Sequence, residues 1–312
     1  MSFSVIVKTF MRPDMLDLCL SSLERLKPQP DMVVVADDGH HTSEELGVYE
    51  RHKDTLNLKP LLLPYDIGIS KARNMAFKAC SKDSHYILLL DDDMEPPSNI
   101  FEVHEVMEED LSIGGVSPLQ EEKGEIHGVG ADILFEGRYC RIGVYDKKEV
   151  QRTSTGIGYY IYDYISNCAL FRREALEAIP GPWDPEFVIG YEHSDFYIRQ
   201  KKLDSWKFAL TPDYVARHTR DPFKDYAKKD TGEDPYLQER YNREKLNHSY
   251  KYLCEKHGLK GHRNEFFHIP TWKTWRSQLF HWVTRRMMPV QLYCLLTPHY
   301  EDIRKFLRWF YR

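Results

Sequence analysis

Strand and helix signals alternate along the first 110 residues, and this alternation limits the fold more than any other feature. The predicted strands are Ser4–Thr9, Met32–Ala36, Leu61–Leu63 and Tyr86–Leu90, and the predicted helices run from Pro13 to before Pro28 and over Ser70–Cys80. Continuous apolar strands such as MVVVA and YILLL are typical of parallel sheets buried on both faces. The sequence therefore predicts an α/β fold with a doubly wound, mainly parallel sheet.

Composition and charge exclude several classes of protein. Only 17 Gly and 17 Pro stand among 312 residues and 13% are aromatic, which excludes a disordered or collagen-like chain. A net charge of −5 argues against a nucleic-acid partner. The six cysteines form no CxxC pair, so we expect neither a zinc site nor a disulfide scaffold, and a reducing cytoplasm is the expected location. Strand signals begin within the first residues of the sequence, so we expect no signal peptide. The apolar runs are far shorter than the ~18 residues of a membrane span, so we expect no transmembrane helix.

Carboxylates follow three of the four predicted strands. Asp37 and Asp38 follow the second strand, Asp66 lies after the third, and the run from Asp91 to Asp93 follows the fourth. In doubly wound sheets, ligands bind beyond the carboxyl ends of the strands. Three successive aspartates are costly unless a cation binds them, and hard cations such as Mg²⁺ or Mn²⁺ prefer oxygen ligands and substrate phosphates. The sequence thus predicts a metal-bridged nucleotide diphosphate, with capping of a helix after Pro96 as the alternative.

Two enzyme classes that share this sheet type fit the sequence less well. Nucleotidyltransferases and NAD-dependent dehydrogenases both need a glycine-rich phosphate loop after the first strand. The segment from Thr9 to Arg12 reads TFMR and has no glycine. A sugar nucleotidyltransferase stays as an alternative only because it shares the aspartates.

Several motifs in a fixed order resemble the family-2 glycosyltransferases with the GT-A fold. They are the first strand with Arg12-Pro13, VVVADDG over 33–39, DIGISKARN over 66–74, LLLDDDMEP over 88–96, NCALFRREAL over 167–176 and GYEHSDFYIR over 190–199. The resemblance covers about residues 3–220. It implies an inverting, metal-dependent transferase of the hexosyl or N-acetylhexosaminyl type. Such an enzyme takes its sugar from a nucleotide-sugar, most simply a UDP-sugar, and adds it to a hydroxyl of a glycan or lipid-linked acceptor, as in polysaccharide biosynthesis.

The resemblance also implies the residues that bind the donor. Thr9 and Arg12 lie near the nucleotide, and one carboxylate of Asp37 and Asp38 accepts the N3–H of uracil while the other caps the next loop. A carboxylate is a suitable acceptor for an imide N–H, which is the physical reason to expect uridine. Arg73 is the cation that the family places near the base or diphosphate, with an ordinary surface arginine as the alternative.

The aspartate run and one histidine form the implied metal site. The resemblance gives Asp91 to the ribose or the metal and Asp93 to the metal, which is Mn²⁺ or Mg²⁺. Asp92 is grouped with the nucleotide-sugar residues, although strand alternation turns it away from its two neighbours. His218, after a predicted strand over 213–216, completes the metal shell in several GT-A enzymes; the alternative is a surface or core histidine.

The segment Glu192–Asp195 contains the candidates for the base that accepts the acceptor hydroxyl's proton. Glu192 and Asp195 are three residues apart and share a helix face. The family usually has Glu-Asp where this chain has Glu192-His193, so the choice stays open. We favour Glu192, because an i,i+4 ion pair with Arg199 would explain Asp195. His193 is the third candidate, since histidine titrates near neutrality. The departure at His193 is also the one sign of an alternative function, a catalytically inactive relative that acts as a binding or scaffold subunit.

Two further segments carry weaker predictions. Asn167 and Cys168 are expected on the acceptor side, and the tyrosine-rich run over 159–164 is either a sugar-stacking surface or an ordinary strand. The expected organisation is a catalytic domain over 1–220, a charged, tyrosine-rich helical segment over 221–270 without assigned chemistry, and a tail over 271–312.

The tail differs from the rest of the chain. Residues 271–312 hold eight Lys/Arg against two Asp/Glu and four of the six tryptophans. Trp272, Trp275 and Trp282 recur at helical spacing opposite basic residues, which predicts a basic amphipathic helix. Two interpretations stay open: peripheral contact with the inner face of an anionic membrane, or packing on the core or on a second subunit in a homo-oligomer.

Overall fold

The computed structural model describes residues 2–219 and 235–264. These residues divide into a larger unit, within 1–130 and 148–250, and a smaller unit, within 131–147 and 251–312. The predicted tail over 271–312 lies outside the described residues. The predicted domain boundaries at 220 and 270 stay predictions.

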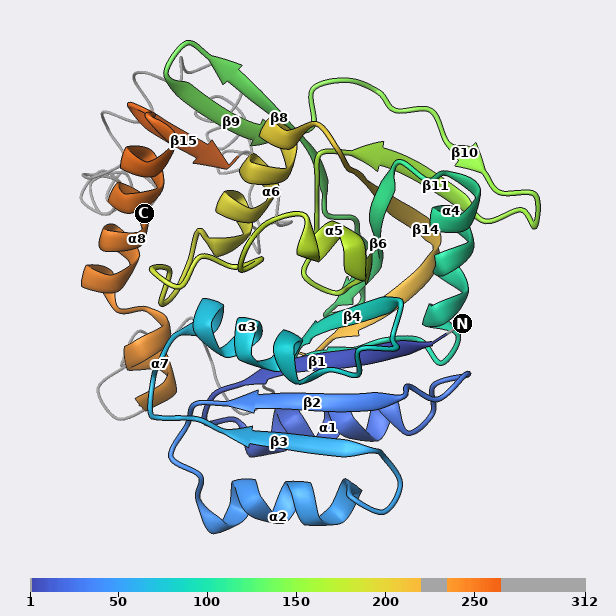
Figure 1. Cartoon of the computed structure of the whole chain (residues 1–312), viewed down its shortest axis with the longest axis vertical. Helices are drawn as coiled ribbons and strands as arrows, with labels where there is room; N and C mark the ends of the chain where they lie inside the picture. Colours follow the sequence, from blue (N-terminus) through green and yellow to red (C-terminus); the bar gives the residue numbers. More distant parts are fainter. Residues whose placement is uncertain (1, 220–234, 265–312) are drawn as a thin grey trace, which may run out of the picture. The chain divides into compact units, whose positions relative to one another are not determined.

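The larger unit is built on an eleven-stranded mixed sheet, with the order β10-β11-β14-β6-β13-β4-β1-β2-β3 and with β5 and β7 paired to β14 and β6 (Figure 1). Its strands are β1 (Phe3–Thr9), β2 (Met32–Asp37), β3 (Leu58–Leu62), β4 (Tyr86–Asp91), β5 (Met94–Glu95), β6 (Ile113–Glu122), β7 (Glu125–His127), β10 (Gln151–Arg152), β11 (Gly158–Tyr162), β13 (Ala169–Arg172) and β14 (Lys207–His218). β12 (Tyr164–Ile165) lies outside this sheet. The four strands at one end, β4, β1, β2 and β3, are parallel to one another, as the sequence predicts.

Helices cover both faces of the parallel strands. The helices among the described residues are α1 (Pro13–Leu23), α2 (Ser43–His52), α3 (Ile69–Ala79), α4 (His104–Glu109, after a 3-10 turn over Ile100–Val103), α5 (Arg173–Glu177), α6 (Glu192–Leu203), α7 (Pro235–Arg240) and α8 (Arg243–His257). Val5 and Val7 of β1 share a buried core with Leu16 of α1. The intervening Ile6 is fully buried on the opposite face, where α3 packs on β1 and β2. Burial on both faces explains why these strands are continuously apolar.

Strand register places the carboxyl ends of β1, β2 and β4 side by side. Thr9 is paired with Asp37 across β1 and β2, and Lys8 with Asp91 across β1 and β4. Because the strands are parallel, the residues that follow them emerge along one edge of the sheet. The predicted convergence of the aspartate-bearing strand ends is therefore confirmed.

The long strand β14 adds a histidine to this edge. It runs parallel to β6 and then pairs with β5, with His218 opposite Met94. The backbone N–H of Thr219 donates to the carbonyl of Asp93 at 2.8 Å. A residue more than a hundred positions away thus lies beside the aspartate run.

Strands and one helix segment make up the described part of the smaller unit. β8 (Gly130–Glu136) and β9 (Tyr139–Gly143) are antiparallel, and β15 (Gly261–Asn264) is parallel to β9. Its core contains Cys140 and Ile142, both fully buried, and the nearly buried His262.

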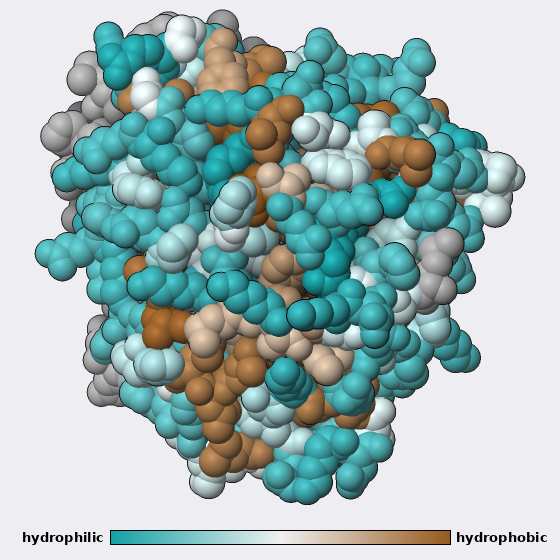
Figure 2. Space-filling view, viewed as in Figure 1, coloured by the Kyte–Doolittle hydropathy of each residue, from teal (hydrophilic) through white to brown (hydrophobic). Residues whose placement is uncertain are grey.

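The edge strand β3 carries exposed apolar side chains, and Figure 2 shows apolar residues gathered over β3 and α3 on this face. Leu62 is 50% exposed and Met75 44%. Pro60, which has no N–H to donate, and the exposed Lys59 make the strand a poor template for further pairing.

Among the described helices, none has the length and apolar character to cross a membrane.

Candidate functional site

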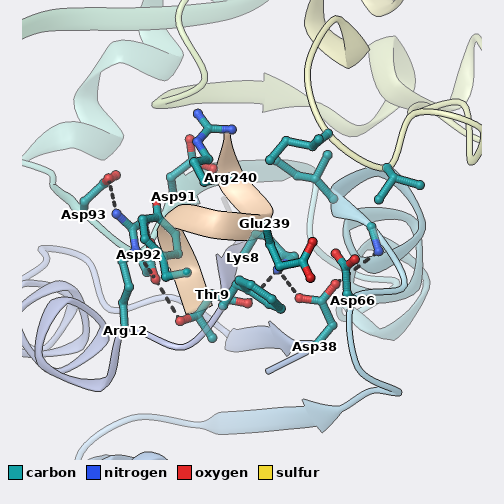
Figure 3. Close-up of a pocket in the computed structure, with 16 residues that line it drawn as sticks. Lys8, Thr9, Arg12, Asp38, Asp66, Asp91, Asp92, Asp93, Glu239 and Arg240 are labelled. Atoms are coloured by element: carbon teal, nitrogen blue, oxygen red, sulfur yellow. Dashed lines mark hydrogen bonds and ion pairs between the residues drawn. The ribbon is translucent and has the colours of Figure 1, made fainter. Parts of the chain in front are cut away.

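A pocket opens where the carboxyl ends of β1, β2 and β4 meet (Figure 3). At one end it is lined by Lys8, Phe10, Asp38, Asp66, Gly68, Ile69, Val188, Ile189 and Glu239, and at the other by Thr9, Arg12, Asp91, Asp92, Asp93, Tyr236 and Arg240. The first end combines apolar walls with the buried ion pair of Lys8 and Asp38 and with two carboxylates, Asp66 and Glu239, that both contact Lys245. The second combines carboxylates with arginines.

The three aspartates of the run have different partners. Asp91 accepts from Arg73 at 2.5 Å and from the Asn167 amide at 3.2 Å. Asp92 is 1% exposed and accepts from the Thr9 hydroxyl at 2.8 Å and from Arg12. Asp93 accepts from Arg12 at 2.8 Å. The helical turn after Pro97 is preceded by Asn99, so the aspartates do not cap it and that alternative is wrong.

These contacts separate the aspartates electrostatically. Burial raises the pKa of Asp92 to about 6 despite the guanidinium of Arg12. Burial opposes ionisation of Asp93 as well, but Arg12 and His218 outweigh it and hold the pKa of Asp93 well below its ordinary value. For Asp91, Arg73 outweighs burial and lowers the pKa. Asp91 and Asp93 are therefore ionised carboxylates at neutral pH.

Only the second of the two aspartates after β2 lines the pocket. Asp37 is fully buried and accepts from the Tyr49 hydroxyl at 2.6 Å and from the Gly39 N–H at 2.9 Å. Asp38 accepts from the Lys8 ammonium at 2.5 Å and from the Gly68 N–H at 3.1 Å. Of the two sequence-predicted candidates, Asp38 thus lies where a ligand can reach it, and Asp37 joins α2 to the loop.

Arg73 is fully buried, so the alternative of a surface arginine is wrong. Its Nη2 contacts Asp91 at 2.5 Å, and its Nη1 lies 3.5 Å from Glu192 Oε1 and 3.0 Å from His193 Nε2. Arg73 does not line the pocket itself. It connects the aspartate run to the start of α6.

Glu192 begins α6 after a sharp turn. Tyr191 has a left-handed backbone with φ of 65°, which directs the chain from the preceding loop into the helix. Glu192 is 5% exposed, and its Oε2 is buried without a hydrogen-bond partner among the described residues. Burial lowers the pKa of the adjacent His193 to about 4, so its ring is neutral at pH 7.

The contacts of Asp195 are different. Asp195 is fully buried and accepts from Arg199 Nε at 2.8 Å. Arg199 also donates to the carbonyls of Gly181 and Pro182. The i,i+4 pair predicted from the sequence is therefore present, and it joins α6 to the preceding loop.

His218 lies beside the last aspartate of the run. Its Nε2 is 3.7 Å from Asp93 Oδ2, and its Nδ1 is 3.3 Å from Glu122 Oε2. Adjacent ligands of an octahedral ion at about 2.1 Å lie roughly 3.0 Å apart, so the two atoms would have to approach one another to share an ion. Glu122 suits the role of orienting the ring. Over residues 2–219 and 235–264, no cluster of three or more His, Cys, Asp or Glu side chains forms a complete metal site.

Besides the apolar Val188 and Ile189, the structure adds four charged or aromatic lining residues that sequence reasoning missed. Lys8 comes from within β1, and Tyr236, Glu239 and Arg240 come from α7. The guanidinium of Arg12 lies 4.7 Å from the Tyr236 ring centre. Lys8 carries a charge in an otherwise apolar strand, and that signal was available. No sequence pattern connects α7 to the distant aspartates.

The remaining predicted positions lie close to the site or serve the fold. Asn167 orients Asp91 through its amide. Cys168 is fully buried and packs in the core. The tyrosine-rich run forms β11 and β12, as the strand interpretation predicts.

Comparison with solved structures defines the class of fold. S. aureus TarS 1–349 in complex with UDP has 22% identity and a TM-score of 0.50, over 71% of this chain and 61% of that chain. GalNAc-T7 with UDP, GalNAc and Mn²⁺ has 16% identity and a TM-score of 0.54, over 70% and 44%. The mannosyltransferase PcManGT from Pyrobaculum calidifontis, in complex with GDP-Man and Mn²⁺, has 16% identity and a TM-score of 0.50, over 72% and 59%. The fold is therefore the GT-A fold of glycosyltransferases, as predicted.

The family follows from the sequence comparison. The model of glycosyl transferase family 2 matches residues 4–179, more than half of the chain, and this protein belongs to that family. The chain spans less than two thirds of the length of each of the three solved structures named above. No curated protein matches the chain.

Proposed function

We propose that this protein is an inverting, metal-dependent glycosyltransferase that moves a hexosyl or N-acetylhexosaminyl group from a UDP-sugar to a hydroxyl of a glycan or lipid-linked acceptor. The observation that carries the proposal is the polarity of the pocket. An apolar end with a buried acceptor, Asp38, suits a base, and an end with Asp91, Asp93 and Arg12 suits a metal-bound diphosphate. A nucleotide diphosphate has the same division between base and phosphates.

The base end supports uridine. Asp38 is 1% exposed and lines the pocket together with Phe10 and the apolar residues Ile69, Val188 and Ile189. A carboxylate accepts the ring N–H of uracil and repels the unprotonated N3 of cytosine. TarS and GalNAc-T7, which share the fold, have been solved with UDP, whereas PcManGT has been solved with GDP-Man.

Asp93 and His218, with Asp91 nearby, are the residues that would hold Mn²⁺ or Mg²⁺. Their oxygen and imidazole donors suit these ions, and the phosphates of the donor would supply further ligands. When bound, the ion stabilises the negative charge that develops on the leaving diphosphate. Arg12, which now contacts Asp93 at 2.8 Å, supplies positive charge at the same end of the pocket.

Glu192 is the proposed base, and Asp195 and His193 are the alternatives. Its free Oε2 accepts the proton of the acceptor hydroxyl, while Oε1 lies 3.2 Å from His193 and 3.5 Å from Arg73. The hydroxyl oxygen then forms the new bond to the anomeric carbon as the bond to the β-phosphate oxygen breaks and UDP leaves. One displacement inverts the anomeric configuration. Asp195 is a weaker candidate because Arg199 already occupies its carboxylate.

The acceptor and the location of the protein depend on the tail, which lies outside the described residues. The charge and tryptophan content of 271–312 support contact with an anionic membrane surface on the cytoplasmic side, where a lipid-linked acceptor would lie. Packing of the tail on a second subunit is the alternative. Both stay predictions from the sequence.

The test is release of UDP from a panel of UDP-sugars, measured with Mn²⁺ and again after EDTA, with and without candidate acceptors. The proposal expects release from one or a few donors and its loss in EDTA. No release from any UDP-sugar would reject the proposal, and no release from GDP-sugars either would favour an inactive relative.

A further inference from the structure

Lys8 is a buried cation inside the strand that begins the site. It is 8% exposed, and its ammonium donates to the carbonyl of Thr9 at 2.6 Å and to Asp38 at 2.5 Å. An ammonium has three N–H donors, and two are used in these contacts. Lys8 also lines the pocket, so its third N–H can reach a bound ligand (Figure 3).

Asp38 is held rigidly next to this ammonium. One oxygen accepts from Lys8 and the other from the N–H of Gly68 at 3.1 Å. Gly68 has φ of +96°, and a Cβ there would lie 2.7 Å from the Cα of Val188, so another residue would displace this N–H. A carboxylate has about four acceptor positions, and the two that remain stay available to a ligand.

The other charged groups at this end have partners of their own. Asp66 and Glu239 both contact Lys245, the latter at 2.5 Å. Among the described residues that line this end, Lys8 is the side chain that can donate a hydrogen bond, and Asp38 is the acceptor next to it. The surrounding walls, from Ile69, Val188 and Ile189, are apolar. A ligand that enters must match the donor–acceptor pair or leave it unsatisfied.

We infer that Lys8 is a specificity-determining residue that reads the nucleobase together with Asp38. The pair matches a ring N–H beside a ring carbonyl, with Asp38 accepting from the N–H and Lys8 donating to the oxygen. Uracil presents this edge at N3–H and the O4 carbonyl, whereas cytosine presents an unprotonated N3 and an amino group at the same two positions. The O2 carbonyl is common to both bases. The inference rests on the proposed function and deepens it. It assigns the choice between uracil and cytosine, which have the same ring size, to the donor Lys8 as well as to the acceptor Asp38.

The experiment compares the binding of UDP and CDP by calorimetry in the full chain with Mn²⁺. UDP and CDP have the same ring size and the same phosphates, so their ratio isolates the base edge. The wild type should prefer UDP by about 10- to 100-fold, the range of a well-made bidentate base contact. Lys8→Met should lower that ratio several-fold without abolishing it, because Asp38 still favours the N3–H of uracil. Lys8→Arg, which keeps donors and charge, should retain more of the ratio.

The matched control is Lys59→Met. Lys59 is an exposed lysine on β3 that does not line the pocket, and the wild-type ratio should persist. If Lys8→Met weakens UDP and CDP equally, or leaves the ratio unchanged, Lys8 serves only the fold and the inference is overturned. If the wild type binds UDP without preference over CDP, the inference fails while the proposed transferase activity stands. If neither nucleotide binds, both fail.

A second variant covers the case in which Lys8→Met does not fold because Asp38 is left buried without its cation. The double variant Lys8→Met/Asp38→Asn removes both charges and therefore leaves no unpaired ion. It should fold and show no preference for UDP. A double variant that keeps the wild-type preference would show that the base is read elsewhere.

Discussion

Replacement of Arg73 by methionine should destabilise the protein far more than the loss of an ordinary salt bridge. The guanidinium is fully buried and contacts Asp91 at 2.5 Å, with Glu192 at 3.5 Å. Methionine retains the apolar stem of the side chain, so packing is largely conserved. The change therefore removes the positive charge and leaves the carboxylates of Asp91 and Glu192 without this cation.

The magnitude follows from the burial of Arg73 and Glu192, whose side chains are 0% and 6% exposed, while that of Asp91 is 30% exposed. Removing one partner of a buried ion pair costs about 3–5 kcal/mol, because the remaining charge keeps its desolvation cost. For a unit of this size, each kcal/mol shifts Tm by roughly 2–4 °C. Arg73→Met should therefore lower the free energy of unfolding by about 3–5 kcal/mol and Tm by roughly 6–20 °C.

The assay is urea unfolding followed by circular dichroism, with Arg51→Met as the matched control. Arg51 also contacts an aspartate, Asp17 at 2.8 Å, but its side chain is 56% exposed. Exposed pairs contribute about 0–1 kcal/mol. If Arg73→Met and Arg51→Met differ by less than about 1 kcal/mol, the description of Arg73 as the buried bridge of the site is wrong.

Four further predictions concern the site, the smaller unit and the C-terminal tail. Glu192→Gln should lower kcat by roughly 10²–10⁴ with little change in UDP affinity, because the amide cannot accept the proton; Asp195→Asn should instead lower stability and retain most activity per folded molecule. Asp93→Ala should abolish the response of transfer to Mn²⁺ in a metal titration. Burial lowers the pKa of His262 to about 3, below the 6.5 of the unfolded chain. The neutral ring therefore costs the folded protein no stability above pH 6.5, and protonation of the unfolded chain lowers the free energy of unfolding below that pH. Urea unfolding should show a decrease of roughly 2 kcal/mol between pH 8 and pH 5. If residues 271–312 contact a membrane, cosedimentation of the full chain with anionic vesicles should weaken as salt increases.

Each of these has a result that contradicts it. A kcat effect confined to Asp195→Asn would move the base by one helical turn. Undiminished transfer in EDTA would remove the role of the metal. A His262→Phe variant whose stability depends on pH as strongly as the wild type would show that His262 is not responsible. Salt-independent vesicle binding, or none at all, would leave subunit or core packing as the role of the tail.

The sheet was predictable at β1, β2 and β4 because these strands are buried on both faces. The half-exposed edge strand β3 begins three residues before the predicted Leu61–Leu63 and ends one residue before it. The run Met32–Ala36 was predicted as a strand and the structure extends it by one residue, and Tyr86–Leu90 is likewise extended to Asp91. The helix predicted over Ser70–Cys80 begins and ends one residue earlier. Continuous apolar runs and proline positions are local signals, and they suffice for elements of this kind.

The different roles of Asp37 and Asp38 could not be predicted from the sequence. The two residues are identical and adjacent, and the contact that separates them, the Tyr49 hydroxyl on Asp37, comes from another element. The contribution of α7 to the pocket could not be predicted for the same reason, because Tyr236 contacts Arg12 only through tertiary packing. Local patterns identify which residue types are available for chemistry, and the packing of distant elements decides which of them face the ligand.

The most direct test of the account is a crystal structure of the full chain with UDP and Mn²⁺. The account predicts uracil against Asp38 and Lys8, the diphosphate beside Arg12, and the ion bound by Asp93 and His218. UDP bound with its base at the aspartate run, or outside this pocket altogether, would contradict it.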